Sequence, residues 1–225
     1  KTSSGTTFNH KNNIYYSTRQ GSGTTCYGIY CSNTTGWNST NSNYNQINFN
    51  TTNVTGTGLY YTGYYSGARQ TLALWQSAGA EGANSFGGVP QFVNQDAGDL
   101  HISTTRRTPV ESRGTPIAAV TKDVDGDTRN GTTPDVGADE GTFLGLLTAD
   151  VSPDRFVTPG PNSVRLGSTL FTPQGVVYNG GLNSQSSIPV RMTITNSSNA
   201  VVYNDLQTIG SLASLQRRQG ARLAT

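Results

Sequence analysis

Three aspartates at alternate positions, Asp123, Asp125 and Asp127, are the residues of this chain whose type and spacing most directly suggest chemistry. Carboxylate oxygens are hard ligands that suit Ca²⁺, and calcium loops use such alternating positions. The pattern departs from an EF-hand loop, because Gly126 precedes the third aspartate and Pro134 stands where a bidentate glutamate belongs. Calcium is therefore one of two hypotheses for this segment.

The other hypothesis is a turn fastened by ion pairs. Arg129 follows the aspartates and can form charge-assisted hydrogen bonds with Asp127 or Asp135. We favour this hypothesis, in which no cofactor is required. The expected structural cap consists of Trp75, packed over the open end of the fold, together with Arg129, Asp135 and Asp139.

The two cysteines, Cys26 and Cys31, either form a disulfide or remain buried thiols. On a straight strand they would be about 16 Å apart. A disulfide brings the Cα atoms within roughly 7 Å, so it requires a tight turn at Gly28. Two cysteines are too few for a zinc site, and His10 and His101 lie near neither of them.

Four tyrosines, Tyr60, Tyr61, Tyr64 and Tyr65, form the densest aromatic group of the sequence. If they project outward they can stack on sugar rings, and if they project inward they fill the interior. Strict alternation along a strand lets only half of them face solvent. A carbohydrate-binding surface at these residues is one hypothesis, and packing in the core is the other.

Acidic residues are absent from the first part of the chain, since no Asp or Glu precedes Glu81. Glycosidases need paired carboxylates, and calcium-dependent lyases need carboxylates to hold the ion. Neither site can be built from these residues, so we expect a non-catalytic protein. The alternative is the C-terminal portion of a polysaccharide lyase or other carbohydrate-active enzyme whose active site lies upstream.

The composition predicts strands joined by many turns, because 27 glycines and 11 tyrosines accompany a hydrophobic content of 33% among 225 residues. The net charge of +2 does not indicate a nucleic-acid partner. No run reaches the roughly 18 apolar residues of a membrane-spanning helix. No basic n-region followed by an apolar h-region opens the sequence, so we expect a signal peptide to be absent or already removed.

Short strand-prone segments recur at similar intervals through the first half, which predicts a sandwich or a solenoid. They are Asn13–Tyr16, Cys26–Cys31, Tyr44–Phe49 and Gly58–Tyr61. Asparagine favours the solenoid, because stacked rungs let asparagine side chains form hydrogen-bonded ladders. The asparagines expected to do so are Asn12, Asn13, Asn43, Asn45 and Asn48.

A short helix is predicted around Leu72–Trp75, where Leu72 and Trp75 share a face and Gly79 provides a stop signal. The motifs that follow keep a distinctive order. They are Asn84–Phe86, Pro90–Val93, Gly98–Ile102, Asp123–Arg129 and Asp135–Glu140.

This order resembles the C-terminal part of secreted bacterial right-handed parallel β-helix proteins that carry a choice-of-anchor Q region. The resemblance covers about residues 8–142, with a departure at Arg106–Pro109, where a Ser-Pro-Ala type of segment is usual. It implies a protein that is secreted or held at the cell surface. It does not imply one activity, since lyases, adhesins and fibres all use this fold.

The second half differs in composition and resembles bacterial immunoglobulin-like modules. We expect Ser152–Pro161 to be a linker or a domain-entry turn and Leu215–Arg222 to be non-strand. Strands are predicted at Ser168–Tyr178, Ile188–Thr195 and Ala200–Tyr203. About four strands are visible where a sandwich has seven, so strands are either missing or supplied by another molecule.

The sequence therefore predicts an all-β protein: parallel β-helix rungs and a C-terminal cap over residues 1–142, then a complete or incomplete immunoglobulin-like β-sandwich over 143–225. We expect a non-catalytic, extracellular structural or adhesive protein of a bacterial cell surface or fibre. Its expected partners are copies of itself, joined through exposed β edges, or surface polysaccharide. Neither nucleic acid nor a membrane span is expected.

Overall fold

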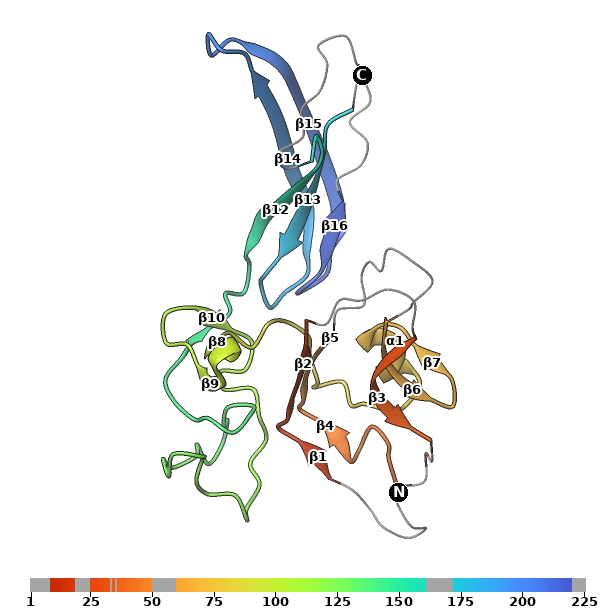
Figure 1. The fold of residues 1–225 in the computed structure, drawn as a ribbon, viewed down its shortest axis with the longest axis vertical. Coiled ribbons are helices and arrows are strands. Elements are labelled where there is room, and N and C mark those ends of the chain that lie inside the picture. Colours follow the sequence, from red (N-terminus) through yellow and green to blue (C-terminus); the bar gives the residue numbers. More distant parts are fainter. Residues whose placement is uncertain are drawn as a thin grey trace. The chain divides into compact units, whose positions relative to one another are not determined.

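The computed structural model describes residues 9–18, 25–32, 34, 36–49, 60–160 and 172–219. Nearly all of its regular structure is β (Figure 1). The chain divides into two compact units, Lys1–Gly145 and Leu146–Thr225. The boundary predicted from the sequence lies three residues earlier.

The first unit is a parallel β-solenoid, as predicted. Strands of one turn pair in parallel with strands of the next. The pairs are β1 (His10–Lys11) with β4 (Ser42–Asn43), β2 (Ile14–Ser17) with β5 (Gln46–Phe49), and β3 (Cys26–Cys31) with β6 (Tyr60–Tyr65). A parallel bridge between Gln46 and Phe86 begins a third turn. Short strands with turn residues between them suit this arrangement because each strand need pair only with its neighbours above and below.

The interior of the solenoid is filled by alternate side chains of these strands. Ile47 is buried with Cys31, Trp75 and Ala80. Tyr15, Ile29, Trp37, Phe49, Tyr65 and Leu72 pack around this cluster. Burial of these apolar groups is the main stabilising contribution of this part of the fold.

One end of the solenoid is closed by β7 (Ala68–Arg69) and α1 (Leu72–Ser77). Strand β7 pairs antiparallel with β6 and so ends the parallel stacking on that sheet. Helix α1 begins where Thr71 Oγ1 accepts a hydrogen bond from the Leu74 N–H, and Gly79 (φ 79°) follows the helix end. The side chain of Gln76 donates to the carbonyls of Gly82 and Ser85 at 3.0 Å, covering the main-chain groups of the third turn.

The segment from residue 90 to 145 packs on the outer side of β2 rather than over the end of the solenoid. It contains β8 (Phe92–Asn94), the 3₁₀ helix η1 (Gln95–Ala97), β9 (Asp99–Ile102), β10 (Arg107–Thr108) and β11 (Leu144–Gly145). Phe86, Ile102, Val110 and Val136 form a second buried cluster, with Ile14 packed against it. The acidic stretch contributes Val136 to this cluster, so it packs beside β2.

The second unit contains a three-stranded antiparallel sheet and a long hairpin among its described residues. The sheet has the order β12 (Val151–Thr158), β13 (Gln174–Asn179), β16 (Arg217–Gln219), and the hairpin joins β14 (Gln185–Thr195) to β15 (Val201–Leu212). Val177, Ile209 and Leu212 form its buried core.

Two predictions for the second unit are wrong. Much of the expected linker, Ser152–Pro161, lies in β12, because Pro153 is tolerated on the edge strand of a sheet. Part of the basic terminal stretch forms β16, where pairing with β13 overrides weak local propensity. Residues 161–171, which include the start of the expected strand at Ser168, lie outside the described residues.

Candidate functional site

Asparagine stacking between turns is present but extends over fewer positions than predicted. Both the main-chain N–H and the Nδ2 of Asn13 donate to Oδ1 of Asn45, at 2.9 and 3.0 Å. In the third turn Ser85 takes the equivalent place, since the Asn45 N–H donates to its Oγ at 2.9 Å. Asn12 and Asn43 instead fasten loops, through Thr115 and Asn84 respectively.

A buried carboxylate, Glu81, anchors these stacked polar side chains, a role that no sequence pattern indicated. Its side chain accepts hydrogen bonds from Ser42 Oγ (2.7 Å), Asn45 Nδ2 (2.9 Å) and Ser85 Oγ (2.6 Å). Glu81 is 1% exposed. A carboxylate held by three donors and closed to solvent is structural, because no atom of it is presented to a substrate.

The predicted calcium ligands lie close together only in part. Asp123 and Asp125 do meet, but the third carboxylate of the group is Asp139 rather than Asp127, with ligand oxygens within 4.8 Å of one another. Asp127 contributes its main-chain N–H, which donates to Asp123 Oδ1 at 2.7 Å. The three carboxylates come from two segments, Asp123–Asp125 and Asp139, so no linear motif contains them.

The carboxylates of two members of this group, Asp123 and Asp139, already accept hydrogen bonds from main-chain N–H groups. Asp123 accepts the N–H groups of Asp125 (2.9 Å), Asp127 (2.7 Å) and Glu140 (3.0 Å). Partial burial raises the pKa of Asp123, but these N–H groups outweigh it and hold the pKa below its ordinary value. Asp139 Oδ2 accepts the Ile102 N–H at 2.6 Å. Carboxylate oxygens such as those of this group are the ligand type that a hard cation such as Ca²⁺ prefers.

His101 lies beside the aspartates, which the sequence did not predict. Its Nδ1 is 2.6 Å from Asp99 Oδ1 and its Nε2 is 3.1 Å from Asp125 Oδ2. Hydrogen bonding to Asp99 and the charge of Asp125 raise the pKa of His101, and the same bond to His101 lowers the pKa of Asp99. An imidazolium at this position neutralises part of the acidic cluster without any metal.

Arg129 does fasten the acidic segment, although its ion-pair partner differs from both predicted ones. Its Nη2 lies 3.4 Å from Glu140 Oε2, and both side chains are less than 10% exposed. The guanidinium also donates to the main-chain carbonyls of Gly137 (3.1 Å) and Asp135 (2.5 Å). It therefore contacts the backbone of Asp135 and not its carboxylate, and it makes no ion pair with Asp127.

The Asp135 carboxylate is buried and accepts two main-chain N–H groups, from Ser112 (2.6 Å) and Gly141 (3.0 Å). Burial, assisted by the negative charges of Glu111 and Glu140, raises its pKa to about 6. This residue thus joins three segments of the cap, and its ionisation state changes within a mildly acidic range.

The two cysteines are thiols and not a disulfide. Strand β3 runs extended from Cys26 to Cys31, so the tight turn that a bridge would need at Gly28 does not form. Gly28 has another role: a Cβ there would overlap the ring of Phe49, so its small size lets the interior pack. The alternative hypothesis, in which both cysteines remain thiols, is therefore the correct one.

An outward-facing tyrosine ladder runs across β3 and β6. Tyr27 stacks on Tyr61 with ring centroids 5.3 Å apart, and Tyr30 stacks on Tyr64 at 4.9 Å. Tyr27 also meets Tyr64 edge to face at 5.6 Å, so the four rings form one group. Tyr30 is 62% exposed.

The ladder shares only Tyr61 and Tyr64 with the predicted aromatic group. Tyr65 faces inward, where it contacts Trp75 and donates from its hydroxyl to the Trp37 carbonyl at 2.9 Å. Tyr60 is half-buried at the start of β6. Tyr27 and Tyr30 were missed because strict alternation assigns residues three apart to opposite faces. Both pairs nevertheless lie together, since the Tyr27 ring is 5.6 Å from the rings of Tyr30 and Tyr64.

Trp75 is completely buried in the solenoid, where the ring of Tyr65 lies against it. Gly63 lies so close that a Cβ would overlap the indole. This position agrees with the role of Trp75 as packing at the closed end rather than as a platform for a ligand.

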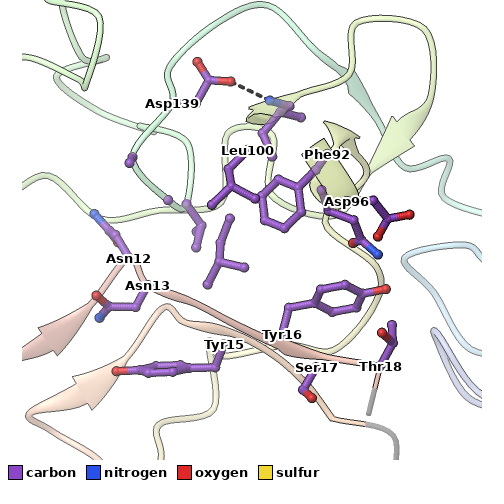
Figure 2. Close-up of a pocket in the computed structure, with 16 residues that line it drawn as sticks. Asn12, Asn13, Tyr15, Tyr16, Ser17, Thr18, Phe92, Asp96, Leu100 and Asp139 are labelled. Carbon is purple, nitrogen blue, oxygen red and sulfur yellow. Dashed lines mark hydrogen bonds between the residues drawn. The ribbon is translucent and has the colours of Figure 1, made fainter. Parts of the chain in front are cut away.

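A groove of about 780 Å³ runs between β2 and the β8–η1–β9 segment (Figure 2). Every residue from Asn12 to Thr18 lines it, although the side chains of Tyr15 and Tyr16 point away from each other. Across the groove lie Phe92, Leu100 and the carboxylates of Asp96 and Asp139. Sequence patterns could not reveal this groove, because its two sides are about 80 residues apart.

Comparison with known proteins leaves the family open: no protein-family description, curated protein or solved structure matches this chain. Among the described residues, no helix has the length and apolar character needed to span a membrane.

Proposed function

We propose that this chain is a non-catalytic, extracellular structural or adhesive protein of a bacterial surface that contacts polysaccharide through the tyrosine ladder Tyr27, Tyr30, Tyr61 and Tyr64. The stacked, exposed ladder is the observation that carries the proposal. Aromatic faces can stack against the C–H faces of sugar rings, and phenol hydroxyls can hydrogen-bond with sugar hydroxyls. The resemblance to choice-of-anchor Q proteins is in keeping with this role.

The distribution of carboxylates supports a non-catalytic role. The tyrosine-bearing turns contain no acidic residue, since none precedes Glu81. Glu81 itself is buried and fully engaged by Ser42, Asn45 and Ser85. A glycosidase needs two carboxylates on either side of the scissile bond, and the turns that carry the ladder supply none.

Affinity electrophoresis tests the adhesive part of the proposal. The full chain is run through gels containing a neutral glucan or a polyuronate, and retardation is measured as a function of polysaccharide concentration. Removing the outer stacked pair with Tyr30→Ala and Tyr64→Ala together should weaken binding about thirtyfold, as expected for the loss of two aromatic contacts worth roughly 1 kcal/mol each. Tyr30→Phe should retain most of the affinity.

Tyr203→Ala is the matched control, because it removes a tyrosine from the hairpin of the other unit. Unchanged migration of the native chain in a broad set of polysaccharide gels would contradict the adhesive role. A fall in viscosity of a polyuronate solution on adding the protein would contradict the non-catalytic role.

We further propose that the second unit is an immunoglobulin-like module of such a surface protein. Support comes from its antiparallel strands and from the core of Val177, Ile209 and Leu212. Residues 146–225 expressed alone should unfold cooperatively in urea, with fluorescence and circular dichroism transitions that coincide. Non-coincident transitions would argue against an independent module.

A further inference from the structure

We propose that Tyr30 and Tyr64 are a modification site, at which oxidation joins the two phenol rings as a dityrosine and so links adjacent turns of the solenoid covalently. The oxidant is a peroxide activated by a haem peroxidase. This proposal does not depend on polysaccharide binding, because it concerns the reaction of the two rings with each other.

The closeness of the two rings is the observation that carries the proposal. Tyr30 and Tyr64 are direct partners in the parallel pairing of β3 with β6 (Figure 1). Their ring centroids lie 4.9 Å apart and their planes differ by 16°. Among the described residues, no other tyrosines in ring contact are as close or as nearly parallel. Partners on adjacent strands place equivalent atoms about one strand spacing apart, roughly 4.8 Å, so the ortho carbons of the two rings are close neighbours.

Coupling these rings requires the loss of two hydrogen atoms in total. Each phenol gives up one electron and its hydroxyl proton, which leaves a radical shared between the oxygen and the ortho carbons. Two such radicals form a carbon–carbon bond between one ortho carbon of each ring. A proton then moves from each of these carbons to the oxygen of its own ring, which restores both phenols. Hydrogen peroxide accepts the two electrons and the two protons and becomes two molecules of water.

The position of the pair within the ladder favours this reaction. Tyr30 is 62% exposed, so the proton that it loses can pass to water. The ring of Tyr27 lies 5.6 Å from the rings of both Tyr30 and Tyr64, and it also stacks on Tyr61 at 5.3 Å. Phenol rings in contact can exchange an electron. A radical formed on any ring of the ladder can therefore reach the closest pair.

A dityrosine at this position joins turns that the cysteines leave unlinked. Cys26 and Cys31 are thiols of one strand, β3. Across the strand pair they face Tyr60 and Tyr65, so neither thiol meets another cysteine in the next turn. A bond between residues 30 and 64 closes a long loop of the chain. It restricts the unfolded state much as a disulfide does, and so favours the folded state.

Oxidation of the full chain tests the site. The dilute native protein is treated with hydrogen peroxide and a haem peroxidase, and the monomer is isolated by denaturing electrophoresis. Chymotrypsin then separates residue 30 from residue 64, because it cuts after aromatic residues such as Trp37, Tyr44 and Phe49. We expect dityrosine fluorescence in the monomer. We also expect one dominant linked pair of peptides, containing Tyr30 and Tyr64, whose mass is two hydrogen atoms below the sum of the separate peptides.

Phenylalanine variants separate the reaction from the fold. Tyr30→Phe and Tyr64→Phe each keep a ring for stacking but remove the phenol, so each should lack the linked pair while the circular dichroism spectrum is unchanged. Tyr203→Phe, in the other unit, is the matched control and should leave the yield unchanged. Tyr30→Phe also distinguishes this proposal from the adhesive one, because it retains the aromatic face that polysaccharide binding requires.

The linked monomer should unfold at a higher urea concentration than the same chain before oxidation, since the link constrains the unfolded state. Three results would overturn the proposal. The first is the absence of dityrosine in the monomer, and the second is a link formed chiefly between chains or between other tyrosines. The third is an equal urea midpoint before and after the link forms, since the bond would then not stabilise the stacked turns.

Discussion

Asn13 and Asn45 are joined by two hydrogen bonds across adjacent turns, with the main-chain N–H and the Nδ2 of Asn13 both donating to Asn45 Oδ1. Asn45 is fully buried, and its own Nδ2 donates to the His10 carbonyl (2.8 Å) and to Glu81 (2.9 Å). The side-chain amide of Asn45 thus satisfies hydrogen-bonding groups in three segments of the chain. In a low-dielectric interior each group left without its partner carries a desolvation cost.

Replacing this amide should destabilise the protein strongly. We expect Asn45→Ala to lower the free energy of unfolding by about 2–4 kcal/mol, because it leaves Asn13 without its acceptor and Glu81 with one donor fewer. Asn48→Ala, at a half-buried position, should change it by less than about 0.5 kcal/mol. Urea unfolding followed by circular dichroism measures both, and equal effects would contradict the assigned role of Asn45.

A Cβ at Gly63 should be poorly tolerated at the closed end. It would overlap the ring of Trp75 and lie 2.8 Å from the main-chain oxygen of Ile29. Gly63→Ala should therefore cost about 1–3 kcal/mol of stability, as overpacked cores do. Gly210→Ala is the matched control, since nothing lies within 4 Å of a Cβ there. A thermal shift of equal size for both variants would refute this account.

The stability of the first unit should depend on pH through Asp135. Its pKa is raised to about 6 in the folded protein from 3.8, chiefly by burial. The folded state therefore binds the proton more tightly than the unfolded state, so ionisation of Asp135 costs stability as pH rises from about 4 to about 6. The size of this loss is on the order of 1–3 kcal/mol.

Unfolding free energies measured between pH 4 and pH 7 test this dependence. Asp135→Asn should flatten the decline in that range, while lowering stability at pH 4, because an amide cannot accept from both Ser112 and Gly141. Asp96→Asn, which removes an exposed carboxylate, should leave the decline in place. The raised pKa of His101 affects stability in a separate range, above pH 6.5, where deprotonation removes its attraction to Asp99 and Asp125.

Chelation should leave the acidic segment intact if Arg129, His101 and main-chain donors hold it. We expect the melting temperature to be the same in EDTA and in millimolar Ca²⁺. Asp123→Ala should lower stability by about 1–2 kcal/mol in either condition, because its carboxylate accepts three N–H groups. Asp125→Ala should have a smaller effect.

Calcium binding would produce a different result. A ligand at a hundred times its dissociation constant stabilises the folded state by about 2.7 kcal/mol. A calcium-dependent rise in melting temperature that disappears in Asp125→Ala would therefore contradict the ion-pair hypothesis and identify Asp123, Asp125 and Asp139 as ligands.

Several features follow from local sequence and could be predicted. Repeated strand-prone segments rich in asparagine indicated a parallel solenoid, because stacked turns let asparagine side chains form hydrogen-bonded ladders. The spacing of Leu72 and Trp75, with Gly79 after them, predicted the short helix, since capping and one apolar face are properties of adjacent residues.

Other features depended on the fold as a whole. Strand register and contacts between distant loops decide three of these features. They are the contact of Tyr30 with Tyr64, the presence of Asp139 rather than Asp127 beside Asp123, and the ion pair of Arg129 with Glu140. Sequence thus determined which elements form in the solenoid, and only tertiary structure decided which side chains meet, because those contacts join segments that are distant in the chain.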